Sequence, residues 1–534
     1  MSRAAALTFD NRFTRALPAD ERTDNERRQV AGASFSRVKP QTVSAPRVIA
    51  VAEDLAAELG IDAAWLASEE FRDVMAGNRV LPGMDPHATV YGGHQFGNWA
   101  GQLGDGRAIN LGELKLPSSG HRMLQLKGAG PTPFSRMADG LAVLRSSVRE
   151  FLCSEAMHHL GVPTTRALSL VLTGESVLRD MLYDGNAALE PGAVVCRVAS
   201  SFVRFGHFEL PTSRGDVELL RRTADFVIRT ELPDLLTAEQ IEGAALGAED
   251  YLAWYREVIR RTALLMVDWQ RVGFVHGVMN TDNLSITGLT IDYGPYGWLD
   301  DYDPDWTPNT TDASTRRYRY GQQPAVAQWN LAQLGNAIAP LIERVEPLQD
   351  ALNRYAPIFT RAYRDAFAAK LGVPSDDDAT PELIGELERT LPVVEVDMTI
   401  FFRSLAEVGP ASSPGSALSI VEDAFYDTAA LTGEALAAWE SWFERYAAAL
   451  ARGGVDRDAR RQAMNAVNPC YVLRNYLAQQ AIDEAEQGNY DELHRLQRVL
   501  ERPFEEQAGA ERYAERRPDW ARDRVGCSQL SCSS

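Results

Sequence analysis

The sequence predicts an α+β fold, with a β-rich lobe in its N-terminal part and a larger, mostly helical lobe after it. Segments with the strand-like patterns of a sheet occur up to about residue 215, for example MLQLKGAG and ALSLVLTG. From residue 216 to about residue 505 the apolar residues recur instead at helical spacing. A chain of 534 residues can bury a large core in two or three packed lobes.

Local signals divide the chain into four segments. They are an N-terminal extension that packs on the lobes, the β-rich lobe, the helical lobe and a C-terminal tail with Cys532, at residues 1–80, 81–215, 216–505 and 506–534. In the extension, apolar spacing and Gly60 predict a helix from Pro46 to Leu59. In the β-rich lobe, two strands are expected to form a hairpin around Gly174. In the helical lobe, a helix is expected directly after Pro469. The polar stretch after Glu505 is predicted to be a surface tail.

The charge of the chain limits its partners. With 54 basic and 74 acidic residues the net charge is −20, which argues against nucleic acid and anionic membranes, since both are polyanions. An anionic ligand would need a local nest of basic residues. The sequence has no apolar run as long as a membrane span and its N-terminus lacks the apolar core of a secretory signal, so we expect a cytoplasmic protein. Five cysteines do not make a disulfide framework.

A glycine-rich segment covers residues 91–112, YGGHQFGNWAGQLGDGRAINLG. Glycines let backbone amides approach a phosphate closely, but the match to a GxGxxG fingerprint is poor, and a set of tight turns in a sheet fits equally well. Arg107 favours a phosphate here, whereas Asp105 disfavours direct contact. His94 could be a ligand, although a histidine beside aromatic residues is more often packed or hydrogen-bonded.

Two charged residues follow in an informative order. Lys127 ends the strand MLQLKGAG, and Glu150 lies on a helix predicted from Leu141 to Leu160. A strand lysine followed by a helix glutamate is the order that builds the lysine–glutamate ion pair of protein kinases, which directs the lysine to phosphates. The alternative is that Glu150 lies on the solvated face of its helix.

Arg197 and Arg204 lie in an apolar segment rich in Val and Phe. They are seven residues apart, so a bend or helical turn must intervene if both are to serve one site. Buried arginines need anionic partners, and a nucleotide phosphate or a structural carboxylate would satisfy them. Together with Lys127 and Arg107 they could form the basic nest that an anionic ligand needs.

The stretch from His276 to Gly294, HGVMNTDNLSITGLTIDYG, carries the strongest chemical signal. Asp282, Asn283 and Asp292 offer oxygen ligands suited to a divalent metal on a polyphosphate. Protein kinases use H-R-D-x-x-x-x-N followed by D-F-G, and here Val278 stands at the position of the base. Besides Asp292, Asp282 is the only carboxylate on this loop. Local turns are the alternative, but the order of all these parts predicts a kinase-like nucleotide site and a bilobal fold.

Several longer motifs in the sequence resemble those of a known protein family. They are YGGHQFGNWAGQLGDGRA, LQLKGAGPTPFSR, ADG, HGVMNTDN, DYGPYGWLD and NPCYVLRN. With these motifs the sequence resembles the selenoprotein O family, whose members are kinase-fold protein adenylyltransferases, over nearly its whole length.

The resemblance implies a reaction and a set of site residues. It implies transfer of AMP from ATP, bound in a flipped orientation, to Ser, Thr or Tyr hydroxyls of other proteins, with release of pyrophosphate. UMP transfer with Mn²⁺ is a variant. Asp282 is implied as the proton acceptor, and Asn283 and Asp292 as the ligands of Mg²⁺ or Mn²⁺. The residues implied at the nucleotide are Gly104, Gly106, Arg107, Lys127, Asp139, Gly140, Arg197, Arg204 and Asp292, with Glu150 paired to Lys127.

Other readings of the sequence stay open. A kinase that uses Asp282 as its base and a pseudokinase scaffold that only binds nucleotide are the competing functions, and we expect a monomer. Cys532 occupies the place of the family's C-terminal selenocysteine or cysteine, but the family's activation-loop cysteine has no counterpart in residues 306–309. Redox control through that loop is therefore not expected. A bridge between Cys527 and Cys532 and an idle thiol are both compatible with the sequence.

Overall fold

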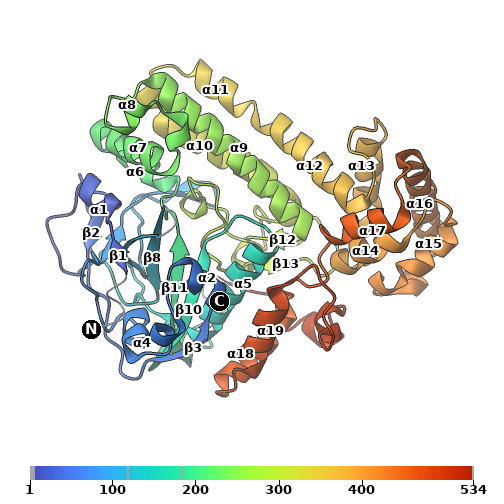
Figure 1. Cartoon of the computed structure of the whole chain (residues 1–534), viewed down its shortest axis with the longest axis horizontal. Coiled ribbons are helices and arrows are strands. Elements are labelled where there is room, and N and C mark those ends of the chain that lie inside the picture. Colours follow the sequence, from blue (N-terminus) through green and yellow to red (C-terminus); the bar gives the residue numbers. More distant parts are fainter. Residues whose placement is uncertain (1–6, 117–119, 182–184, 532–534) are drawn as a thin grey trace.

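The computed structural model describes residues 7–116, 120–181 and 185–531. Within these residues the fold is mixed α/β, with a nine-stranded antiparallel sheet in the first 200 residues and helices over most of the remainder. This confirms the predicted α+β class. Figure 1 shows the sheet at one side, the long helix α9 (Ala248–Val272) above it, and helices α13 to α17 gathered at the opposite end.

The large sheet has the order β2-β4-β7-β8-β11-β10-β3. Its strands are β2 (Phe35–Arg37), β4 (His87–Thr89), β7 (Ala108–Lys115), β8 (His121–Lys127), β11 (Ala188–Ala199), β10 (Arg166–Arg179) and β3 (Arg47–Val51), with β1 (Thr8–Phe9) on β7 and β9 (Ala142–Val143) on β11. Lys127 lies opposite Ala108 on one side and Val195 on the other. The last residue of β8 is therefore held between two central strands.

Strand β11 shows how the sheet separates two cores. Val194, Cys196 and Val198 pack into one apolar cluster with residues of α2 (Glu53–Glu58) and α4 (Glu69–Met75), which cover one face. Val195 and Ala199 pack into the other cluster with α5 (Leu144–His159). Because side chains alternate along a strand, Arg197 lies on the α5 face.

Helices dominate the chain after residue 205. The structure contains α6 (Gly206–Ser213), α7 (Val217–Glu231), α8 (Ala238–Ile241), α9, α10 (Gln323–Ile342), α11 (Glu346–Leu352), α12 (Tyr355–Leu371), α13 (Thr380–Thr390), α14 (Met398–Ser404), α15 (Pro414–Ile420), α16 (Gly433–Gly453), α17 (Arg457–Asn465), α18 (Asn475–Glu486) and α19 (Asp491–Leu500), together with α1 (Arg12–Ala16) and α3 (Ala63–Leu66) near the start. Across the described ranges, no helix is long and apolar enough to cross a membrane.

Helix α9 precedes the motif that begins at His276. It ends at Gly273, whose φ of 75° is left-handed and favours glycine. The short strand β12 (Phe274–Val275) follows and pairs with β13 (Gly297–Trp298). The motif is thus a loop between two paired strands, anchored at one end by a helix of 25 residues.

Three local predictions were wrong. The helix expected from Pro46 to Leu59 is β3 followed by the short α2, because its apolar residues also fit an edge strand against β10. The hairpin expected around Gly174 is a single strand, β10, with an irregular register between Leu172 and Ser176. The helix expected directly after Pro469 begins only at Asn475.

The segment after Glu505 is not a surface tail as far as residue 531. Ala521, Leu530 and Ser531 are fully buried. The Leu530 amide donates to the Pro308 carbonyl at 2.9 Å, and the Thr310 amide donates to the Leu530 carbonyl at 2.7 Å. Cys532 and the predictions about its thiol lie outside the described residues.

Candidate active site

A cavity of about 660 Å³ lies where the end of the sheet meets the loop that begins at His276. It is the place where the residues singled out in the sequence converge. Eleven of them line it, namely Gly104, Gly106, Arg107, Lys127, Asp139, Gly140, Arg197, Arg204, Asp282, Asn283 and Asp292. Glu150 lies behind the wall, in contact with Lys127.

Lys127 and Glu150 form a buried ion pair between β8 and α5. Glu150 is only 2% exposed, so it does not lie on the solvated face of its helix. Burial lowers the pKa of Lys127 to about 8, against the opposing effect of the Glu150 carboxylate. An anionic ligand in the cavity would favour the charged form of the lysine further.

Arg197 and Arg204 meet at one carboxylate, that of Asp292. The strand β11 ends at Ala199 and the chain turns before α6, which brings the two side chains to the same site. Nη1 of Arg197 lies 2.5 Å from Oδ1 of Asp292 and 3.3 Å from Glu150, while Nη1 of Arg204 contacts Oδ2 of Asp292. Burial opposes ionisation of Asp292, but Arg204 and Arg197 hold the pKa of its carboxyl well below the usual range.

Asp292 also adopts an unusual backbone conformation, with a φ of 57°. Non-glycine residues rarely occupy this region, and they are held there only by surrounding contacts. Beside it, the His276 ring contacts the Ile291 carbonyl at 2.8 Å and stacks on Trp269. The backbone is therefore fixed on the side that carries the carboxylate.

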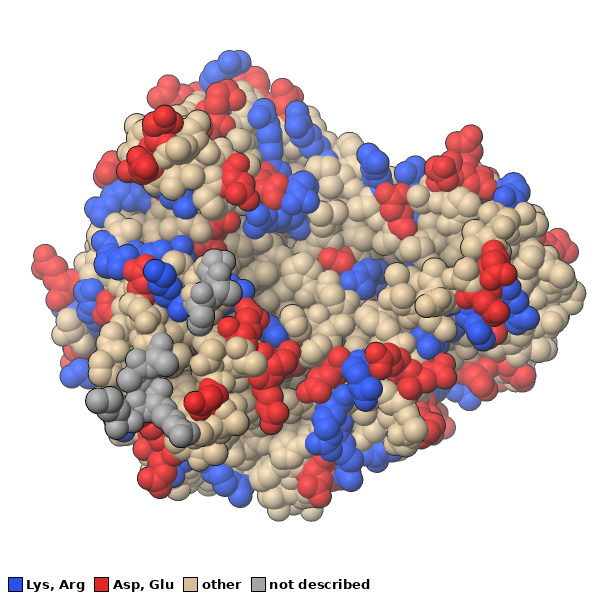
Figure 2. All heavy atoms as spheres, viewed as in Figure 1, with Lys and Arg blue, Asp and Glu red and all other residues tan. Residues whose placement is uncertain are grey.

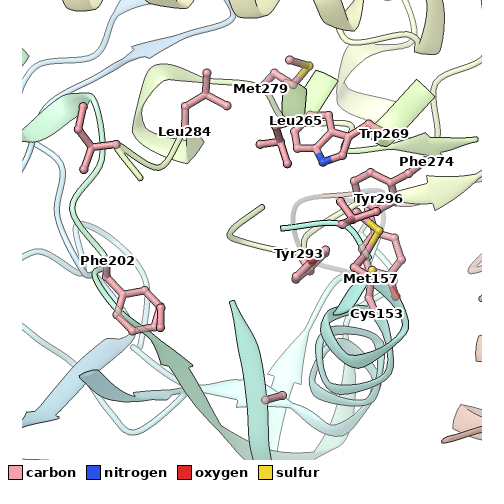
Figure 3. Close-up of a cluster of buried hydrophobic side chains, with 14 of the residues drawn as sticks. Cys153, Met157, Phe202, Leu265, Trp269, Phe274, Met279, Leu284, Tyr293 and Tyr296 are labelled. Atoms are coloured by element: carbon pink, nitrogen blue, oxygen red, sulfur yellow. The ribbon is translucent and has the colours of Figure 1, made fainter. Parts of the chain in front are cut away.

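An apolar frame surrounds this loop, as Figure 3 shows. Met279 and Leu284 come from the loop itself, and Tyr293 and Tyr296 follow Asp292. They belong to one core with Trp269, Phe274, Cys153 and Met157, which come from α9, β12 and α5. Rings such as Phe274 and Trp298 lie 5.1 Å apart, edge to face. Such packing leaves little freedom to the polar residues between these anchors.

Asp282 has one carboxylate oxygen bonded and one free. Gln95 Nε2 donates to Oδ2 at 3.1 Å, whereas Oδ1 is buried without a partner among the described residues. Burial raises the pKa of Asp282 to about 7, with hydrogen bonding from Gln95 and the charge of Arg204 acting in the opposite direction. A carboxylate with a pKa near neutrality is suited to accept a proton. Val278, at the position of the kinase base, lines the same cavity with an apolar side chain.

The oxygen atoms at this end of the cavity fit a divalent metal. Asn283 donates from Nδ2 to the Val278 carbonyl at 3.0 Å, which leaves its amide oxygen as the ligand atom. Asp292 supplies an ionised carboxylate at the same cavity. Hard oxygen donors of this kind suit Mg²⁺ or Mn²⁺. The residues present therefore fit the metal that the sequence implies.

The glycine-rich loop is packed against protein rather than open. A Cβ on Gly104 would lie 2.5 Å from Cγ of Phe134, and the φ of Gly104 is +147°. Asp105 is buried and accepts hydrogen bonds from the amide of Thr89 at 2.9 Å and from its hydroxyl at 2.7 Å. The carboxylate that disfavoured a phosphate contact is thus occupied by hydrogen-bond donors of the protein, and Nη2 of Arg204 lies 3.8 Å from its Oδ1. The glycine-rich loop can therefore present Arg107 to the cavity while the Asp105 side chain points to Thr89.

Asp139 and Gly140 lie at the other wall of the cavity. Asp139 is bound by Arg179 at 2.7 and 2.8 Å and accepts from the Leu141 amide at 3.0 Å. Gly140 has a φ of +77° and a Cβ there would meet Gly130 at 2.3 Å. The turn therefore requires glycine.

Three further residues line the cavity although sequence reasoning assigns them no site role, namely Gln95, Arg136 and Arg179. Arg136 ends the motif LQLKGAGPTPFSR and Arg179 falls in a predicted hairpin, and neither pattern by itself gives the arginine a site role. Gln95 lies inside the glycine-rich motif, and that motif is the only signal that could have drawn attention to it.

Comparison with known sequences identifies the class of enzyme. A family model described as "Protein adenylyltransferase SelO" matches residues 23–501. Proteins named "Protein nucleotidyltransferase YdiU" from Azoarcus sp. (strain BH72), Rhodopirellula baltica and Aromatoleum aromaticum are 58%, 56% and 56% identical, each over 99% of this chain and 99% of the relative. The chain is therefore a protein nucleotidyltransferase. The chain belongs to the SelO family, which confirms the resemblance seen in its motifs.

Proposed function

We propose that this protein transfers AMP from ATP to Ser, Thr or Tyr hydroxyls of other proteins and releases pyrophosphate. The observation that carries the proposal is the arrangement of the His276 loop. The kinase base position holds Val278, and the nearby Asp282 lines the cavity, with its Oδ1 buried and without a partner among the described residues. We further propose that the chain has a kinase-like bilobal fold, with lobes at residues 81–215 and 216–505, and that the reaction takes place in it.

In this mechanism Asp282 accepts the proton of the acceptor hydroxyl. The hydroxyl oxygen attacks the α-phosphorus, and the bond from that phosphorus to the oxygen bridging to the β-phosphate breaks. Lys127, Arg107 and the two arginines at Asp292 place positive charge where the pyrophosphate leaves. A metal held by Asn283 and Asp292 would supply further neutralisation of the phosphate charge.

Arg107 supports this use of the cavity. It faces the cavity near Lys127, and no carboxylate of the described residues lies within 4.0 Å of its guanidinium. The acidic chain as a whole carries a charge of −20, so an unpaired arginine beside a buried lysine is a specific place for an anion. Nucleotide phosphates have the matching charge.

The experiment that tests the proposal is a comparison of labels. The protein is incubated with acceptor proteins and ATP labelled at either the α- or the γ-phosphate, with Mg²⁺ or Mn²⁺. We expect protein to be labelled from the α-position only, and the label to disappear in Asp282→Ala. Transfer from the γ-position would identify a kinase instead, and binding without transfer would identify a scaffold. UTP labelled at the α-phosphate tests the UMP variant in the same assay.

A further inference from the structure

Part of the glycine-rich segment forms a separate hairpin, which contacts residues 276–294, here called the catalytic loop. Among the described residues, strands β5 (His94–Gln95) and β6 (Asn98–Trp99) pair with each other and not with the nine-stranded sheet. The hairpin approaches the 3-10 turn Thr281–Asn283, which contains Asp282. Its position suggested a phosphate loop in the sequence, but in the structure it contacts the catalytic loop directly.

Three consecutive residues of the hairpin donate hydrogen bonds to three consecutive residues of the catalytic loop. The bonds are from the His94 amide to the Thr281 hydroxyl at 2.7 Å, from Gln95 Nε2 to Asp282 Oδ2 at 3.1 Å, and from the Phe96 amide to Asn280 Oδ1 at 3.1 Å. Of the three acceptors, only Asp282 is a candidate for chemistry. The other two bonds fix the distance between hairpin and loop.

Both sides of this junction are anchored to the protein. Glu209 on α6 accepts from the Thr281 hydroxyl at 2.5 Å and contacts the His94 ring at 2.6 Å. Tyr318 donates from its hydroxyl to Asn280 at 2.6 Å. Because hydrogen bonds hold the backbone on both sides of Gln95, the Cα position of Gln95 is fixed relative to the catalytic loop.

Gly93 shows how closely the hairpin backbone approaches Asp282. A Cβ at Gly93 would lie 2.6 Å from Oδ1 and 2.9 Å from Cβ of Asp282, and Gly93 does not need a left-handed φ. Glycine is required here for space. The Asp282 carboxylate therefore sits between the Gly93 backbone and the Gln95 amide.

We infer that Gln95 is a positioning residue for the nucleotidyl transfer reaction. It holds Oδ2 of Asp282 and thereby fixes the orientation of this carboxylate at the cavity that both residues line. A neutral amide is suited to this task, since it donates a hydrogen bond without adding a charge that would pair with the base. The inference rests on the proposed function, because it assigns to Asp282 the role of proton acceptor.

The test compares Gln95→Met and Gln95→Glu with Asn98→Ala in the full-length protein. The first removes the donor at nearly constant size, and the second replaces it by a carboxyl group that repels the Asp282 carboxylate when ionised. Asn98 lies in the same hairpin and is exposed, and within the described part of the chain its side chain donates to the Phe96 carbonyl alone, at 3.3 Å. We expect kcat for label transfer from α-labelled ATP to fall about 10- to 100-fold in both Gln95 variants, with the KM for ATP and the unfolding temperature unchanged. Asn98→Ala is expected to keep the kcat of the original protein.

Two outcomes would overturn the inference. One is an unchanged kcat in Gln95→Met when the unsubstituted protein is active and Asp282→Ala is not. The other is a crystal structure of Gln95→Met in which the Asp282 carboxylate keeps its orientation, a result that does not depend on activity. If the unsubstituted protein transfers no nucleotide, the proposed function fails instead, and the orientation of Asp282 in the crystal still decides the positioning role.

Discussion

At the residue scale, the carboxylate of Asp292 has two roles that compete for the same oxygen atoms. In the structure it compensates the buried charges of Arg197 and Arg204, and in the proposed reaction it also binds a metal. A metal ion must therefore share the carboxylate with guanidinium groups. The arginines can turn to phosphate oxygens when nucleotide arrives, so we expect metal and nucleotide to bind better together than separately.

Replacing Asp292 by Ala should destabilise the protein as well as inactivate it. Two buried guanidinium groups would lose their closest carboxylate, and such a loss costs about 2 kcal/mol or more of unfolding free energy. Asp139→Ala is the matched control, since it breaks the partly exposed pair with Arg179 and should cost about 1 kcal/mol or less. Denaturant unfolding without nucleotide measures both. Equal stability of the two variants would contradict this account of Asp292.

The pKa of Asp282, raised to about 7 by burial, predicts the pH dependence of the reaction. A proton acceptor must be ionised, so kcat should rise as the pH passes through about 7 and level off above it. The measurement is kcat from pH 5.5 to 9 at saturating ATP and metal. A rate that is flat over this range would show that Asp282 is not the group that accepts the proton.

The same raised pKa affects stability with a definite sign. Between pH 3.8, the usual pKa of an aspartate, and about 7, the folded protein holds a proton that the unfolded chain has lost. This stabilisation is present at low pH and is lost as the pH rises through about 7. Asp282→Asn, which cannot ionise, should therefore unfold about 2 °C higher than the original protein at pH 8 without metal. The gap should be smaller at pH 5 and should close only below pH 3.8, where the unfolded chain also holds the proton.

At the element scale, the β5–β6 hairpin makes a glycine substitution informative. Gly93→Ala would force a methyl group against the Asp282 carboxylate. A displacement of about 1 Å can cost about 100-fold in rate, so we expect a loss of transfer of at least about tenfold. Gly415→Ala in α15 is the control, because no atom lies within 4 Å of the position that its methyl group would take. Full activity in Gly93→Ala would mean that the catalytic loop tolerates movement of the hairpin.

The elements also show what the sequence could and could not predict. The order of Lys127, Glu150, Asn283 and Asp292 along the chain matches their meeting at one cavity, because the elements that carry them follow in a recognisable order. The bond between Gln95 and Asp282 joins residues 187 positions apart, and no local periodicity reports it. The helix expected from Pro46 failed because its spacing fits a strand equally well, and the neighbouring strand β10 decides between them.

At the scale of the whole molecule, acidic and basic side chains are interspersed on the face shown in Figure 2. The positive charge of the candidate site is instead buried, on Lys127, Arg197 and Arg204. Buried charges are screened by salt much less than exposed ones. Nucleotide binding should thus depend on these few residues rather than on the overall charge of −20.

Residues 530 and 531 connect two distant parts of the molecule. Leu530 bonds to Pro308 and Thr310, and Asn309 between them donates to the Gly277 carbonyl of the catalytic loop at 2.9 Å. Ser531 donates to the Met181 carbonyl, just beyond strand β10. These contacts link the segment beside the catalytic loop to the end of the sheet.

Deleting residues 530–534 should therefore loosen the segment around Asn309. We expect faster proteolytic cleavage between residues 306 and 319 and a lower transfer rate than in the full chain. Limited proteolysis followed by mass spectrometry locates the cleavage. An unchanged digestion pattern in the deletion variant would show that other contacts hold this segment.

The same contacts have a consequence for how the protein is made. During translation, Thr310 leaves the ribosome 220 residues before its partner Leu530. At about 5 to 20 residues per second, this interval lasts roughly 10 to 45 s. A nascent chain can already fold its sheet and long helices in that time. Its segment around Asn309, however, lacks the hydrogen bonds to Leu530 until that residue has left the ribosome.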